Sequence, residues 1–300
     1  MKISKSILFT LLSVFYLNSM IGQMIILSGP EKGSYNYIVN DMIKVCDNDS
    51  IGDIKNIPSS GSAFNFDQLV DPNTPVKMVM IQSDYLYYQA MLDNKNNTKK
   101  TASLSILMPL AYEEIHVVTR DEKRLNKLGD LFEKNVACGT ENEGTFATAT
   151  FMKDRSRVFW NTKLIPYPQA LKELLGRQID AFIIVGSAPL ELLNVNPQSL
   201  VTQIAIMNLD NVNDWAEFYT PRMIKAGTYK WQTSDVNTFG VRTVLLVNES
   251  KLTADDRIFI DRFTQSVKSN YVKLVESGHP SWIEVNFADW DPTDWRLYTK

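Results

Sequence analysis

The stretch VKMVMIQSDYLYYQAML, residues 76–92, runs an apolar strand into a short polar cap and then into a helix. Two earlier segments, residues 24–45 and 55–70, repeat this order. Open α/β sheets bind ligands in crevices at the carboxyl ends of their strands, and helix N-termini favour anions. The three caps therefore predict an α/β fold with a ligand site made of backbone amides and hydroxyl groups.

A second series of strand-to-helix units begins after residue 134 and ends near residue 206. Ile115–Thr119 and Thr238–Val247 alternate as strands on either side of it. We therefore expect two lobes, each with its own sheet, joined by these two crossing strands and closing about a hinge. The expected domains are residues 1–22, an export signal, then 23–118 with 240–300 as lobe 1, and 119–239 as lobe 2.

Two further segments have helical periodicity. Asp121–Lys134 is charged and carries leucines on one face, which predicts a helix. Ala254–Glu276 reads as one long amphipathic helix, with Thr253 as its N-cap and two aspartates behind it.

The amino terminus has the pattern of a secretory signal peptide. Lys2 and Lys5 precede the apolar run Ile7–Leu17, which is too short to span a membrane. We expect cleavage after Gly22 and a soluble, periplasmic mature protein. An uncleaved N-terminal anchor is the alternative reading.

The composition is that of an ordinary globular protein. The chain has 300 residues, 44% of them hydrophobic and 22% charged, which suits one large domain or two of ordinary size. Its net charge is −3 and no basic tract exists, so nucleic-acid binding has no electrostatic basis. Cys46 and Cys138 lie far apart in sequence, and two buried free thiols are favoured over a disulfide.

Four short motifs are candidate ligand contacts because small or hydroxyl residues there leave helix amides open. They are Gly33-Ser34-Tyr35, Ser60-Gly61-Ser62, Gln82-Ser83-Asp84 and Gly144-Thr145. Each also fits plain helix capping, and Asp84 in particular is expected to cap its own helix.

The sequence offers no set of catalytic groups. Glu113 and Glu114 are adjacent on a predicted strand, so their side chains point to opposite faces and cannot work as an acid–base pair. His116 is expected to be a structural, hydrogen-bonding histidine. There is no phosphate-binding Gly-Lys-Ser/Thr run, no Gly-x-Ser-x-Gly elbow and no metal-ligand spacing. We expect a protein that captures a ligand, with no enzymatic activity, metal or cofactor.

In addition, the chain resembles the TAXI family, the solute receptors of TRAP transporters. The stretches that carry the resemblance occur in the family's order: Gly33–Tyr37, Ser60–Asn65, Ile81–Asp84, Glu113–Val118, Gly139–Thr145, Asp180–Phe182 and Ala226–Tyr229. Any one of them is weak, but together they are specific.

The resemblance implies a two-lobed periplasmic-binding-protein fold, type II-like, with the ligand cleft between the lobes. Such a monomeric receptor captures an organic anion, often a dicarboxylate, or an amino acid such as glutamate, and delivers it to a TRAP-type membrane permease. The contacts carried over by motif are Tyr35, Ser60, Ser62, Gln82, Glu113, Gly144 and Thr145, with Tyr229 closing over the ligand.

One departure from the family bears on the ligand. Glu143 stands where the family usually has Ser, and Glu141 precedes it. An added carboxylate disfavours an anionic ligand, which leaves a zwitterion open. The alternatives for the whole chain are the binding protein of an ABC importer of phosphonate or sulfonate type, a periplasmic ligand sensor, and an enzyme on the same scaffold.

Overall fold

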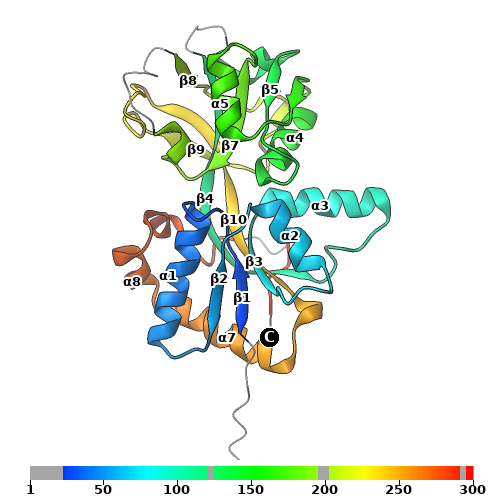
Figure 1. The fold of residues 1–300 in the computed structure, drawn as a ribbon, viewed down its shortest axis with the longest axis vertical. Helices are drawn as coiled ribbons and strands as arrows, with labels where there is room; N and C mark the ends of the chain where they lie inside the picture. Colours follow the sequence, from blue (N-terminus) through cyan, green and yellow to red (C-terminus); the bar gives the residue numbers. More distant parts are fainter. Residues whose placement is uncertain (1–22, 121–124, 195–202, 291–294, 300) are drawn as a thin grey trace, which may run out of the picture.

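The fold has two lobes with a narrow waist between them (Figure 1). Two long strands, β4 (Leu104–Arg120) and β10 (Val236–Asn248), run through the waist side by side and pair in antiparallel fashion. The computed structural model describes residues 23–120, 125–194, 203–290 and 295–299. The predicted export signal at residues 1–22 and its cleavage site lie outside the described residues.

The described strands belong to one sheet of ten, in the order β2-β1-β3-β10-β4-β7-β5-β6, with β8 paired to β4 and β9 to β10. The remaining strands are β1 (Met24–Leu27), β2 (Ile54–Ile57), β3 (Met78–Gln82), β5 (Asn135–Ala137), β6 (Asn161–Lys163), β7 (Ala181–Gly186), β8 (Ile204–Ile206) and β9 (Thr220–Ile224). The expectation of a separate sheet in each lobe is wrong, because β4 and β10 are long enough to pair with strands of both lobes.

The α-helices of the described chain are α1 (Ser34–Asn48), α2 (Ser62–Val70), α3 (Ser83–Asn96), α4 (Gly144–Ser156), α5 (Tyr167–Leu175), α7 (Ala254–Ser269) and α8 (Tyr271–Ser277). Short 3-10 turns are η1 (Leu128–Leu131), η2 (Glu191–Leu193), η3 (Val212–Asp214), η4 (Glu249–Lys251) and η5 (Pro280–Glu284). None of the helices described combines the length and the apolar character that crossing a membrane requires.

Two of the predicted helices differ from expectation. Within the described part of Asp121–Lys134, only η1 forms, and the Asp130 carboxylate there accepts hydrogen bonds from the backbone amides of Asn126 and Lys127. Such local side-chain bonds compete with a regular helix. The long C-terminal helix is divided at Asn270 into α7 and α8.

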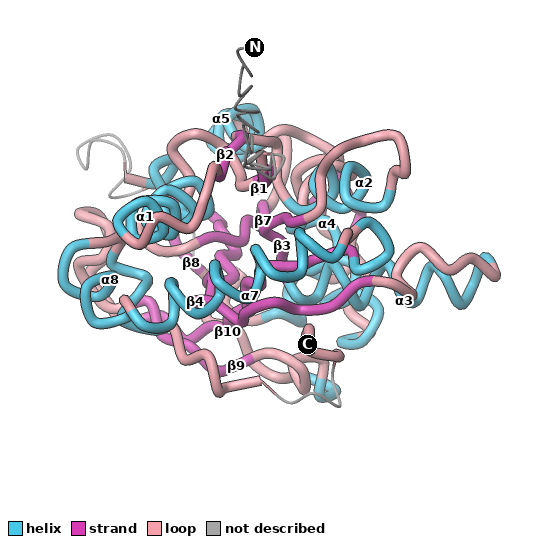
Figure 2. Tube along the Cα trace, turned by 90° about the horizontal axis from the view of Figure 1, so that it is seen from below, coloured by secondary structure: helices cyan, strands magenta, loops and turns pink. Residues whose placement is uncertain are grey.

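Helices cover both faces of the sheet, which explains why the inner strand β3 is apolar from Met78 to Ile81. In β3, Met78 and Met80 pack into one core of lobe 1, whereas Val79 and Ile81 pack into the other. α1 and α7 cover the first core, and α2 and α3 cover the second (Figures 1 and 2). In lobe 2, α4 and α5 cover opposite faces of β7 in the same way.

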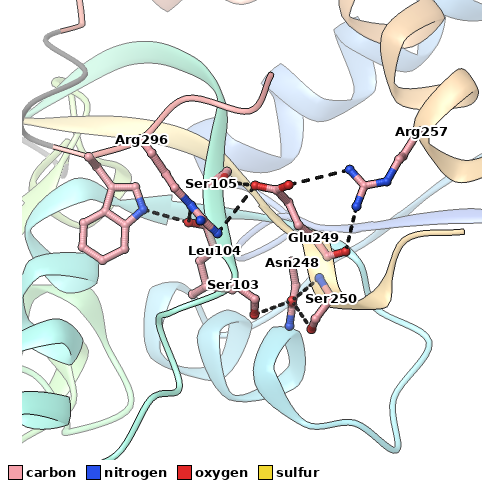
Figure 3. A network of polar contacts seen from close by, with 9 residues as sticks. Ser103, Leu104, Ser105, Asn248, Glu249, Ser250, Arg257 and Arg296 are labelled. Atoms are coloured by element: carbon pink, nitrogen blue, oxygen red, sulfur yellow. Dashed lines mark hydrogen bonds and ion pairs between the residues drawn. The ribbon is translucent and has the colours of Figure 1, made fainter. Parts of the chain in front are cut away.

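A polar network ties the end of β10 to the start of β4, at the edge of lobe 1 away from the waist (Figure 3). The Glu249 carboxylate accepts a hydrogen bond from Ser105 and forms ion pairs with Arg257 and Arg296, each at 3.6 Å. Arg296 also accepts a backbone hydrogen bond from Ile106 at 3.0 Å, which fixes the C-terminal segment on β4.

The two cysteines lie in separate cores. Cys46 is in α1 of lobe 1, and Cys138 follows β5 in lobe 2. Both are buried free thiols, which confirms the prediction. Burial raises the pKa of Cys46 to about 11 and that of Cys138 to about 12, so both stay in the unreactive thiol form at neutral pH.

Candidate functional site

A cavity of about 600 Å³ lies at the waist and takes its walls from both lobes. Lobe 1 contributes the starts of α1 and α2, the end of β3 and the segment around η5. Lobe 2 contributes the start of α4, the end of β7 and the loop after it. The strand β4 passes between them and adds Tyr112, Glu113 and Glu114. A cavity of this size suits a small molecule.

Seven of the eight residues predicted to contact a ligand line this cavity: Tyr35, Ser60, Ser62, Gln82, Glu113, Gly144 and Thr145. Most of them stand at helix starts, where a strand gives way to the helix through a small or polar residue. The shared geometry of strand ends and helix starts thus brings together motifs that are far apart in the sequence.

The starts of α2 and α4 meet directly across the waist. A Cβ atom built on Gly144 would lie 1.7 Å from Gln82 Oε1 and 3.0 Å from Ser62 Oγ. The Ser62 hydroxyl in turn accepts a hydrogen bond from the backbone amide of Gln82 at 3.1 Å. A side chain at position 144 would therefore have to displace the Gln82 side chain, and glycine lets the two lobes approach with Gln82 in place.

Glu113 is the charged group at the centre of the lobe 1 wall. Its carboxylate accepts hydrogen bonds from the Tyr35 hydroxyl at 3.0 Å, from Gln82 Nε2 at 3.2 Å and from the Ser34 hydroxyl at 3.2 Å. All of these donors are uncharged. Burial raises the pKa of Glu113 to about 7, against the opposing effect of the three hydrogen bonds.

Glu114, the next residue, has different partners, as expected for neighbours on a strand. Arg222 Nη2 lies 3.1 Å from its carboxylate, and the Ala188 amide donates to it at 3.0 Å. Its negative charge is therefore matched within the protein, unlike that of Glu113.

The other wall of the cavity is held by local bonds. Thr145 Oγ1 accepts a hydrogen bond from the Val185 amide at 3.0 Å, which ties α4 to β7. The Glu143 carboxylate folds back to accept a bond from the Thr140 amide at 3.0 Å, and burial raises its pKa. Of the two glutamates that depart from the TAXI pattern, Glu143 lines the cavity, while Glu141 is exposed and does not.

The structure does not bring Tyr229 to the cavity. Its ring is fully buried in the core of lobe 2. The Leu190 amide donates to the Tyr229 oxygen at 2.9 Å, and the Tyr229 hydroxyl donates to His116 Nε2 at 2.9 Å. His116 Nδ1 then donates to the Glu114 carbonyl at 2.9 Å. Burial lowers the pKa of His116 to about 4, so the ring stays neutral and holds the cavity wall in place.

Asp84 gives the waist a second point of contact. It was predicted to be the N-cap of its helix, but the N-cap of α3 is Gln82 and Asp84 lies within the first turn. Its carboxylate also accepts hydrogen bonds from two lobe 2 hydroxyls, Thr148 at 2.6 Å and Tyr219 at 3.0 Å. Asp84 therefore links the lobes, a role that the sequence did not indicate.

Several lining residues were not predicted. The segment His279–Glu284 reaches the cavity from the far end of the chain, and Tyr112 and Tyr167 add aromatic surface. Lys32 and Glu191 form an exposed ion pair at the rim, 3.1 Å apart. Among the residues described, no group of three or more His, Cys, Asp or Glu side chains could hold a metal ion.

Fold and site together define the class: this is a two-lobed protein of the periplasmic-binding-protein fold, with a small-molecule cavity between its lobes. The chain belongs to the NMT1-like family, whose profile matches residues 26–281. No curated protein matches it.

Two solved structures share this fold at low sequence identity. PhnD1 from Prochlorococcus marinus (MIT 9301), in complex with methylphosphonate, is 11% identical over 81% of this chain and 83% of that one, with a TM-score of 0.51. XAC2383 from Xanthomonas citri, bound to ATP, is 12% identical over 91% and 93% of the two chains, with a TM-score of 0.50. At such identities the likeness concerns the fold alone.

Proposed function

We propose that this protein is a periplasmic solute-binding receptor. It captures a small polar molecule between its lobes and delivers it to a membrane permease. The observation that carries the proposal is the shared cavity, in which the start of α2 meets the start of α4 across the waist. Helix starts on both sides give a solute hydrogen bonds to each lobe, so a bound solute favours the closed form.

The order of the TAXI-like motifs supports a receptor of the TRAP type, and an organic anion or an amino acid as the solute. Tyr35, Ser60, Ser62, Gln82, Glu113, Gly144 and Thr145 are the proposed contacts. Lobe 1, residues 23–118 with 240–300, and lobe 2, residues 119–239, close as two bodies about the waist. The signal in residues 1–22 exports the chain, and the receptor acts as a monomer without catalysis.

Native mass spectrometry of freshly purified protein tests the capture of a solute. We expect a bound molecule of small mass that is lost on denaturation, and addition of that molecule raises the melting temperature. The double variant Gln82→Ala with Thr145→Val should weaken this stabilisation.

The matched control is Gln178→Ala with Thr233→Val, since both residues are exposed and lie outside the cavity. It should keep the full ligand shift. An unchanged shift in the Gln82/Thr145 variant would remove the site assignment. A gene for a large multi-span permease next to this one supports the TRAP type, and an ATPase gene there contradicts it.

A further inference from the structure

We propose that the solute carries a protonated nitrogen that pairs with the Glu113 carboxylate, so the cavity takes amines and amino acids and rejects acids that lack a basic nitrogen. The inference rests on the proposed function, because it concerns the same cavity. It restricts the proposed solutes to molecules that carry a protonated nitrogen.

The first support is the charge of the cavity wall. Five carboxylates line it, those of Glu113, Glu114, Glu143, Glu191 and Glu284. Lysine and arginine contribute only Lys32 to the described lining, and that side chain is paired with Glu191. His279 also lines the cavity, but burial lowers its pKa and keeps it neutral. The wall therefore has an excess of negative charge, which attracts a cation and repels an anion.

Arg222 reduces this excess without removing it. The guanidinium contacts Glu114 at 3.1 Å and also binds Glu284, and it lies behind the wall rather than in the lining. Both carboxylates are thus occupied by a protein cation. Glu114 is buried with its counter-ion beside it, and the exposed Glu284 is bound by the same guanidinium, so neither is the proposed contact.

Among the described lining acids, Glu113 and Glu143 have no cationic partner. Glu143 folds back onto the Thr140 amide at 3.0 Å, so Glu113 is the proposed contact. It is 7% exposed, and its described hydrogen-bond donors are the neutral Tyr35, Gln82 and Ser34. A carboxylate held by neutral donors keeps a defined orientation but not a balanced charge. An ammonium group beside it supplies the missing charge, and the desolvated site makes that attraction strong.

Gln82 supplies an independent observation. Its Nε2 donates to Glu113, whereas its carbonyl oxygen Oε1 is buried and has no hydrogen-bond partner among the described residues. A buried acceptor without a donor is unfavourable. A nitrogen with more than one hydrogen can donate both to the Glu113 carboxylate and to this amide oxygen, whereas an ionised acid has no hydrogen to offer either.

A thermal-shift panel of amino acids, their deaminated acids, their decarboxylated amines, and polyamines tests the charge class. We expect the compounds that raise the melting temperature to carry a basic nitrogen. Replacement Glu113→Gln should weaken their binding about tenfold or more, since it removes a charge-assisted hydrogen bond. Glu113→Asp, which keeps the charge, should keep the preference for amines. Glu276→Gln, an exposed site on α8, is the matched control.

The outcomes separate the two proposals. If acids without a basic nitrogen stabilise the protein and Glu113→Gln leaves them bound, the charge inference fails while the receptor proposal stands. If no compound binds and native mass spectrometry finds no bound molecule, both fail. The melting temperature of each variant without added compound verifies that it folds.

Discussion

At the scale of single residues, Gly144 shows how closely the two lobes fit. The atom that its side chain would displace, Gln82 Oε1, belongs to a side chain already bonded to Glu113. Glycine at this position leaves room for the Gln82 side chain, and no positive φ is involved.

We expect Gly144→Ala to weaken solute binding about tenfold, because the methyl group forces Gln82 away from Glu113 and removes a hydrogen bond to a charged group. Titration calorimetry with the compound that binds the unchanged protein measures the effect. Gly129→Ala is the control, since a Cβ at Gly129 meets nothing within 4 Å. Equal affinities for the two variants would show that the close contact has no part in binding.

The site was predictable where a local signal marks it. Ser62, Gln82 and Gly144 follow or precede apolar strands and stand at helix starts, so the sequence alone placed them at strand ends. Tyr229 has no such signal, and its motif does not tell a buried ring from one facing a cavity. The contact of Asp84 with lobe 2 depends on a hydroxyl 135 residues away, which no local pattern reveals.

At the scale of elements, α7 has the most complete N-terminal cap that the sequence predicted. The Thr253 hydroxyl accepts a bond from the Asp256 amide, and the Asp256 carboxylate accepts one from the Thr253 amide. Asp256 also forms an ion pair with Lys77, the residue before β3, which ties the start of α7 to that strand.

Replacement Thr253→Ala should lower the free energy of unfolding by about 1 kcal/mol, the usual cost of a lost N-cap. Urea unfolding measures it, with Thr233→Ala, in an exposed loop, as the control. A loss no larger than that of the control would mean that the ion pair with Lys77 alone fixes the helix start.

Elements were predicted well where the apolar pattern is long and poorly where tertiary contacts extend or interrupt it. β4 was expected over Ile115–Thr119, yet it begins at Leu104, because its earlier residues pair with β10 in the core of lobe 1. The predicted helix after β4 gives only η1 in its described part, where Asp130 binds backbone amides.

At the scale of the whole molecule, Asp84 couples protonation to the packing of one lobe on the other. Burial raises its pKa from 3.8 to about 6, although Thr148 and Tyr219 both donate to the carboxylate. Between these two pH values, Asp84 therefore keeps its proton in the folded protein, whereas it has lost the proton in the unfolded chain. An acid whose pKa is higher in the folded protein than in the unfolded chain stabilises the fold at low pH. This contribution is lost as the pH rises through the folded-state pKa.

For the Asp84→Asn variant we expect a smaller fall in unfolding free energy between about pH 4 and pH 6 than for the unchanged protein, by roughly 2–3 kcal/mol. Denaturant titrations across this range measure the difference. The exposed Asp255→Asn variant should follow the unchanged protein. Parallel curves for Asp84→Asn and the unchanged protein would show that Asp84 titrates as it does in the unfolded chain.

The place of β10 in the sheet has a consequence for the order in which the nascent chain folds. This strand lies between β3 and β4, although every other described strand precedes it in sequence. While the ribosome is still adding residues before Val236, the first lobe to be synthesised has a gap at the middle of its sheet, whereas β4, β7, β5 and β6 of the second can already pair. The sheet of lobe 1, which begins first in the sequence, can therefore be completed only after the strands of lobe 2 have been synthesised.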